Sequence, residues 1–175
     1  MLDFNNTKIA FSSKSDGELR NAQILFQTIA HPWLVKCAKS ASNFALKIHF
    51  PISWAVKPTL YRQFVGGETL QECIPVINHL KEYNVKSTLD FSAESEQTPE
   101  GIQATFEETL RSIDFAKGNE NLAYTVFKPS TITTDELLAK ASEKREPLTE
   151  EEKAEYEEFK KRFFALCQRA YDNDV

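Results

Sequence analysis

Residues 85–94, VKSTLDFSAE, and residues 123–131, AYTVFKPST, decide the fold that this sequence predicts. Each stretch holds a short run of β-branched, aromatic and aliphatic residues that ends at polar residues or proline, so we predict strands over residues 85–91 and 123–128. An amphipathic helix is predicted between them over residues 100–117, with Gly118 ending it. The order strand, helix, strand favours two parallel strands joined by a helical crossover, and hence an α/β fold.

Helical patterns dominate the rest of the chain. Ser15, Thr69 and Thr149 are each followed three positions later by a glutamate, which is the capping-box pattern of a helix start. After Thr149 we expect a long helix with one apolar face made of Tyr156, Phe159, Phe163, Cys167 and Tyr171. The other expected segments are a polar arm (1–14), helices (16–29, 33–50, 70–80 and 134–142) and a connector with a short helix at 60–64 (51–68).

The composition excludes several classes of protein for this chain. The 175 residues are 41% hydrophobic and 27% charged, which suits one soluble globular domain, and the net charge of −5 argues against nucleic acid as the main partner. No run of about 18 apolar residues predicts a transmembrane helix. Cys37, Cys73 and Cys167 are widely spaced and the histidines are scattered, so buried or half-buried free thiols in a reducing compartment are expected and a metal site is not.

Charged residues gather where the two predicted strands end. Asp90 lies near the end of the first strand, Glu94 lies just beyond it, and Lys128 ends the second. In parallel α/β folds the functional groups gather at the carboxyl ends of the strands. A lysine there can bind a carboxylate or the polar edge of a cofactor ring, whereas a carboxylate can bind a cationic group. Ordinary salt bridges at strand ends remain the other interpretation.

Four stretches resemble one enzyme family. Residues 63–94, QFVGGETLQECIPVINHLKEYNVKSTLDFSAE, look like the opening of the proline dehydrogenase barrel, and residues 124–131, YTVFKPST, resemble that family's next strand. Residues 147–175, PLTEEEKAEYEEFKKRFFALCQRAYDNDV, are similar to the helix before its third strand, and residues 6–26, NTKIAFSSKSDGELRNAQILF, fit its N-terminal arm. The resemblance covers nearly the whole chain in the right order.

The resemblance implies a flavin enzyme that oxidises L-proline to pyrroline-5-carboxylate and passes electrons through FAD to quinone. It implies an incomplete TIM (β/α)8 barrel, with an N-terminal arm and helical region over residues 1–68 and the first two barrel strands within residues 69–175. Lys128 then corresponds to the catalytic lysine near the flavin and the substrate carboxylate. Asp90 and Glu94 correspond to acids of the substrate pocket, and Glu94 pairs with a late arginine. Pro129 departs from the aliphatic residue usual at that place.

The same resemblance predicts what this chain would lack. The family's third strand with Asp-Ala-Glu and its two late arginines have no counterpart in the 175 residues, so we expect a truncated N-terminal portion that neither binds FAD nor oxidises proline without its C-terminal half. A bacterial cytoplasmic location is expected, free or at the periphery of the inner membrane. Two alternatives stay open: a noncatalytic helical interaction module, and another TIM-barrel enzyme that shares only the lysine.

Overall fold

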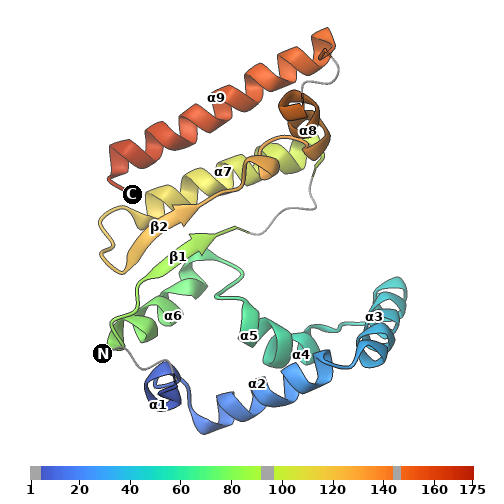
Figure 1. Cartoon of the computed structure of the whole chain (residues 1–175), viewed down its shortest axis with the longest axis vertical. Helices are drawn as coiled ribbons and strands as arrows, with labels where there is room; N and C mark the ends of the chain where they lie inside the picture. Colours follow the sequence, from blue (N-terminus) through green and yellow to red (C-terminus); the bar gives the residue numbers. More distant parts are fainter. Residues whose placement is uncertain (1–4, 92–96, 144–146) are drawn as a thin grey trace. The chain divides into compact units, whose positions relative to one another are not determined.

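Helices make up most of the residues that the computed structural model describes, 5–91, 97–143 and 147–175, and a two-stranded parallel sheet completes them (Figure 1). The chain divides into two compact units, Met1–Tyr83 and Asn84–Val175. The prediction of a mostly helical α/β chain is confirmed, because both strands form and pair in parallel.

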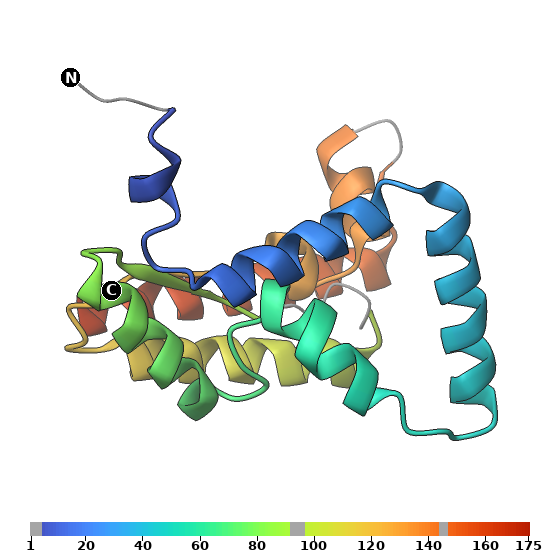
Figure 2. The same cartoon turned by 90° about the horizontal axis from the view of Figure 1, so that it is seen from below.

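In the described part of the N-terminal unit, the elements of secondary structure are all helices (Figure 2). The connector predicted over residues 51–68 contains more helix than expected, with three short helical segments in succession from residue 53 to 64. Pro58 lies in the first turn of η1, which follows α4 without a break. The segments are α1 (Thr7–Ala10), α2 (Asp16–Ile29), α3 (Pro32–Lys47), α4 (Ser53–Val56), η1 (Lys57–Tyr61), α5 (Arg62–Phe64) and α6 (Leu70–Glu82).

Capping interactions set the start of α2 as the sequence predicts. The Ser15 hydroxyl accepts a hydrogen bond from the Glu18 N–H (3.3 Å), and the Glu18 carboxylate accepts one from the Ser15 N–H (2.9 Å). At α6 only half of the predicted box forms. The Thr69 hydroxyl accepts from the Glu72 N–H (3.2 Å), but the Glu72 carboxylate accepts from the N–H of Glu68, one residue earlier than expected (2.8 Å).

The C-terminal unit contains the sheet and its crossover. Strand β1 (Ser87–Asp90) pairs in parallel with β2 (Leu122–Val126), so that Thr88 lies beside Tyr124 and Asp90 beside Val126. Both strands are shorter than predicted. The remaining elements are α7 (Pro99–Ala116), which connects the strands, the 3-10 turn η2 (Pro129–Thr131), α8 (Asp135–Glu143) and α9 (Glu150–Asn173).

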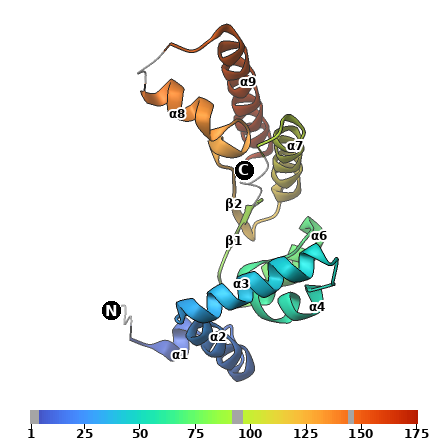
Figure 3. The same ribbon diagram turned by 90° about the vertical axis from the view of Figure 1, so that its right-hand side faces the viewer.

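A small apolar core holds α7, α9 and the segment after β2 together. Ile113 of α7, Ile132 and Leu166 of α9 are almost completely buried. The ring of Phe127, directly after β2, meets that of Phe163 edge to face with centroids 5.5 Å apart. Figures 1 and 3 both show α7 and α9 side by side, as this core requires. The sheet is thus tied to the C-terminal helix through the chain that leaves its second strand.

The apolar face predicted for α9 is correct in its first half and wrong in its second. Phe159 and Phe163 pack against the core, but Cys167 is exposed and Tyr171 is 83% exposed. Steps of four residues advance around a helix faster than its 3.6-residue period, so the buried face continues through Leu166 instead. The capping box at Thr149 forms as predicted.

The two units differ sharply in burial. Within the described part of the N-terminal unit, Ile77 is the only buried side chain, whereas the C-terminal unit buries Ile102, Ile113, Ile132 and Leu166, among others. Aromatic and aliphatic side chains on α2 and α3 stay exposed. The N-terminal helices therefore present apolar surface that their own unit does not cover.

Replacement of Leu166 by alanine should test the corrected face of α9. Because Leu166 is 0% exposed, we expect Leu166→Ala to lower the free energy of unfolding by about 2–5 kcal/mol. Tyr171→Ala, at an exposed position of the same helix, should change it by less than about 0.5 kcal/mol. Urea denaturation followed by circular dichroism measures both variants, and equal losses would contradict the assigned face.

A second test concerns the cap of α2. The backbone N–H and then the hydroxyl of Ser15 lower the pKa of Glu18 to about 2, with a further contribution from Arg62. A lowered pKa stabilises the fold above the ordinary value near 4.5, and this contribution is lost as the pH falls towards 2. We expect Ser15→Ala to raise the Glu18 pKa towards its ordinary value, as measured by NMR titration of the carboxyl carbon. Thr69→Ala, at the other cap, should leave that titration unchanged.

Candidate active-site rim

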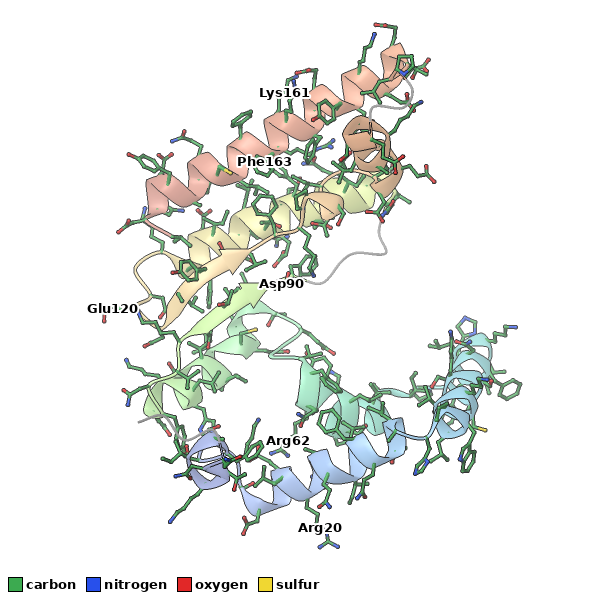
Figure 4. All side chains as sticks on the ribbon, in the orientation of Figure 1. Arg20, Arg62, Asp90, Glu120, Lys161 and Phe163 are labelled. Carbon is green, nitrogen blue, oxygen red and sulfur yellow. The ribbon has the colours of Figure 1, made fainter. Side chains whose placement is uncertain are left out.

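Asp90 and Lys128 meet at the carboxyl end of the sheet. Asp90 is the last residue of β1, and Figure 4 labels it at the tip of that strand. Lys128 follows β2 by two residues in extended backbone. Lys128 Nζ lies 3.2 Å from Asp90 Oδ2, and each side chain is 42% exposed. The expected meeting of these two residues at one rim of a parallel sheet is therefore present in the structure.

The turn after β2 positions Lys128. The Lys128 carbonyl accepts hydrogen bonds from the Thr131 hydroxyl (2.8 Å) and the Thr131 N–H (2.9 Å). Pro129 starts this turn, at a place where a missing N–H costs nothing. Pro129 therefore begins the turn two residues after Phe127, and Lys128 lies at the rim. Sequence reasoning missed Thr131, because a hydroxyl three residues after a carbonyl carries no distinctive signal before the turn is known.

The Asp90–Lys128 ion pair lies on the open face of the sheet. Side chains alternate between the two faces of a strand, so Tyr124, Val126 and Lys128 share one face, and the pairing register adds Asp90. Tyr124 is 67% exposed and Val126 39% exposed. The rim therefore combines a cation and a carboxylate with apolar and aromatic surface just below them. Tyr124 and Val126 could have been found by counting back from Lys128 in steps of two.

The opposite face of the sheet is covered. Leu89 points away from Asp90 by alternation along β1. The register shift between Ser87 and Thr88 interrupts the alternation of β2, and it pairs Leu122 with Ser87, which shares the face of Leu89. Leu89 and Leu122 are 9% and 8% exposed. Helix α7 contacts β2. The sheet of this unit thus buries one face and leaves the face with Asp90 and Lys128 accessible, which is the condition for binding a ligand there.

Two further sequence predictions concern neighbouring residues. Glu94, the second predicted pocket acid, lies outside the described residues. Beyond it, Gln97 donates from its side-chain amide to the Asp135 carboxylate (2.8 Å) and accepts from the Asp135 N–H (3.3 Å). This pair of hydrogen bonds ties Gln97, just before α7, to the start of α8.

The three cysteines are free thiols, as expected, but Cys37 and Cys167 are exposed and only Cys73 is half-buried. The described part of the chain holds no group of three or more histidine, cysteine or acidic side chains suited to a metal ion. Among the described helices, none is both long and apolar enough to pass through a bilayer.

Among the comparisons with known proteins, the one with curated proteins finds relatives of this chain. No family model matches the chain, and no solved structure matches it. Among curated proteins, mitochondrial proline dehydrogenase 1 of Bos taurus is 31% identical over 113 residues, which are 63% of this chain and 19% of that protein. The protein of the same name from Caenorhabditis elegans is 35% identical over 99 residues, 55% of this chain and 16% of that protein.

The chain is similar to proline dehydrogenases. The resemblance predicted from the sequence is confirmed by several such relatives, which include one from Dictyostelium discoideum that is 23% identical over 79% of this chain. A carbapenem antibiotics biosynthesis protein, CarD of Pectobacterium carotovorum, is 30% identical over 81 residues, 46% of this chain. The chain spans a quarter or less of the length of each of these relatives.

The expected bacterial cytoplasmic location is wrong. The proline dehydrogenases that the chain matches come from eukaryotes such as cattle and nematode, and they are named as mitochondrial proteins. The resemblance is to the mitochondrial and the related bacterial members of the family together, and the relatives that match are mitochondrial.

Because the Asp90–Lys128 ion pair is partly exposed, we expect it to contribute little to the free energy of unfolding. A partly exposed ion pair contributes about 0–1 kcal/mol, so Asp90→Asn and Lys128→Ala should each change the free energy of unfolding by less than about 1 kcal/mol. Leu122→Ala, on the covered face of the neighbouring strand, should cost about 2–4 kcal/mol. Urea denaturation distinguishes the three variants. A loss at Asp90 as large as that at Leu122 would mean that the pair is structural.

Proposed function

We propose that this chain supplies the first two strands of the (β/α)8 barrel of a FAD-dependent proline dehydrogenase. In this proposal the whole enzyme oxidises L-proline to pyrroline-5-carboxylate and passes the electrons through FAD to quinone. The observation that carries it is the Asp90–Lys128 ion pair, 3.2 Å apart on the open face at the carboxyl end of two parallel strands. The relatives named proline dehydrogenase support the assignment of the reaction.

The charges of the rim pair suit the substrate. Free proline is a zwitterion, with a carboxylate and a secondary ammonium group on adjacent atoms. A lysine ammonium and an aspartate carboxylate within contact of each other offer the complementary charges at matching separation. In the absence of substrate the two side chains neutralise one another. When proline binds, Lys128 would hold its carboxylate and Asp90 would orient the amine, so the substrate exchanges one ion pair for two.

The open face also fits a flavin. A flat aromatic ring needs apolar surface below it and polar partners at its edge, and Tyr124, Val126 and Lys128 present these groups on one face. FAD, when bound, would supply the acceptor for the hydride from proline. Lys128 would then stand beside both the ring edge and the substrate carboxylate. Its positive charge would orient both molecules and stabilise negative charge that develops between them.

Glu94 belongs to the proposal through the family resemblance. We propose that its carboxylate pairs with an arginine that the 175 residues do not supply, and that this pair closes the substrate pocket. The Gln97–Asp135 hydrogen bonds support such a role, because they anchor the chain shortly after Glu94.

By itself the 175-residue chain should not oxidise proline. A two-stranded sheet leaves the substrate face open to water and both sheet edges unpaired over the described residues, whereas a closed barrel takes about 250 residues. The alternative of a noncatalytic helical module is not favoured, because several of the named relatives are proline dehydrogenases. A purified chain that kept flavin absorbance after desalting would contradict the proposed inactivity.

A chimeric enzyme tests the proposed role of Lys128. The 175 residues replace the matching segment of the Bos taurus relative, and proline-dependent reduction of a quinone analogue is measured. We expect Lys128→Ala to lower kcat/KM by about 100-fold or more, with partial rescue in Lys128→Arg. Lys117→Ala, an exposed lysine just after α7, should leave kcat/KM unchanged.

Flavin absorbance of each chimera separates the possible results. Full flavin content with lost turnover in Lys128→Ala supports a role in proline oxidation. Full flavin content with unchanged turnover would overturn it. An unsubstituted chimera that binds flavin and oxidises a different amine, but not proline, would overturn the proposed substrate.

A further inference from the structure

Arg162 of α9 reaches the chain that follows β2. Its Nη1 donates to the Ile132 carbonyl (3.1 Å) and to Glu155 Oε1 (2.9 Å). The Arg162 side chain is 19% exposed, compared with 50% for Arg169 on the same helix. Because side chains of a helix lean towards its N-terminus, Arg162 extends towards Glu155, which lies two turns earlier on the same side. The Glu155 carboxylate thus holds the guanidinium against a backbone carbonyl of another segment.

The Ile132 carbonyl needs a donor of this kind. Ile132 is 0% exposed, and it directly follows the 3-10 turn η2. A carbonyl removed from water must accept a hydrogen bond within the protein, because leaving it unpaired costs free energy. Bonds from a charged donor are stronger than those between neutral groups. The bond from Arg162 therefore fixes the place where the chain leaves the turn.

The opposite end of the same turn carries Lys128. The Lys128 carbonyl accepts from the N–H and the hydroxyl of Thr131, and the Pro129 carbonyl accepts from the Ile132 N–H (3.3 Å). Hydrogen bonds thus connect the backbone from Lys128 to Ile132. A displacement of Ile132 would pass through these bonds to the lysine, whose ammonium group lies 3.2 Å from the Asp90 carboxylate.

Phe163, the next residue of α9, holds the chain on the other side of Lys128. Its ring meets that of Phe127 edge to face, with centroids 5.5 Å apart. Figure 4 labels Phe163 on α9. Two consecutive residues of α9 therefore contact the residue just before Lys128 and the residue at the end of the turn after it. The backbone of Lys128 is fixed from both sides, although its side chain is 42% exposed.

We propose that Arg162 is a positioning residue for Lys128. Held by Glu155, it fixes the Ile132 carbonyl and so determines where the lysine ammonium group stands at the rim. Small displacements matter there, because a group that binds and orients substrate acts only within hydrogen-bond reach of it. The role in catalysis rests on the proposed function, whereas the hold on the turn does not depend on it.

Lys140 of α8 offers a matched control. Its Nζ lies 2.8 Å from both carboxylate oxygens of Glu152 in α9, and its side chain is 28% exposed. These bonds hold α8 to α9, whereas the bond from Arg162 to Ile132 holds the turn after β2. Arg162→Met and Lys140→Met each remove one cation and its ion pair with a glutamate of α9, and each keeps a long side chain.

Amide hydrogen exchange of the 175-residue chain tests the hold on the turn. In Arg162→Met we expect the N–H groups of Thr131 and Ile132 to exchange at least about tenfold faster, because the turn opens locally. Arg162→Lys keeps the charge and a donor but not the planar fork, so it should restore part of the protection. Lys140→Met should leave both rates unchanged.

The Ile113 N–H, in the core of α7, reports unfolding of the whole unit. Equal acceleration at Thr131, Ile132 and Ile113 in Arg162→Met would mean that Arg162 contributes only to general stability, and it would overturn the proposal. Unchanged rates at Thr131 and Ile132 would overturn it as well. Circular dichroism of each variant establishes that the helices are intact.

A double variant of the chimeric enzyme tests the link to Lys128. Arg162→Met should lower kcat/KM for proline about tenfold at full flavin content, whereas Lys140→Met should not. If Arg162 acts through Lys128, Lys128→Ala/Arg162→Met should be no slower than Lys128→Ala alone. A further loss in the double variant, or an unchanged kcat/KM in Arg162→Met, would overturn the positioning role. An unsubstituted chimera that does not oxidise proline would overturn the proposed function instead, and the exchange rates would still decide whether Arg162 holds the turn.

Discussion

The parallel pairing of β1 with β2 is the constraint on which the candidate site depends. Two parallel strands place their carboxyl ends at one edge, so a carboxylate that ends one strand and a lysine just after the other must come close. The register determines which face they occupy. A shift of one residue would turn Asp90 towards the covered face and separate it from Lys128. The ion pair is thus a consequence of backbone pairing, and its own contribution to stability is small.

The core of the C-terminal unit maintains this register from one side. Ile113, Ile132 and Leu166 bring the crossover helix, the turn after β2 and the last helix together, and Phe127 joins that core directly after the strand. Because Phe127 points into the core, its neighbours Val126 and Lys128 point to the open face. Burial of one aromatic ring therefore decides the direction of the lysine beside it. In the proposed function, this arrangement would let a zwitterion and a flat ring meet opposite charges and apolar surface.

The N-terminal unit differs from the C-terminal unit in how little apolar surface it buries. Side chains cap α2 and α6, at Ser15 and Thr69, yet over the described residues the unit buries little beyond Ile77. Trp33 and Phe44 on α3 stay exposed. In the C-terminal unit the apolar residues make a core, whereas in the N-terminal unit many of them make a surface.

Local chemistry in the sequence determined the elements. Capping boxes predicted the starts of α2 and α9, proline and glycine predicted ends, and alternation between strands and helices predicted parallel pairing, because each of these signals acts within a few residues. Such signals also brought Asp90 and Lys128 to the same rim. Only the tertiary structure decided that Leu166, and not Cys167, faces the core, that the pair lies on the open face, and that Trp33 and Phe44 on α3 stay exposed. These outcomes depend on which surfaces meet, and the packing contacts that decide them leave no local pattern in the sequence.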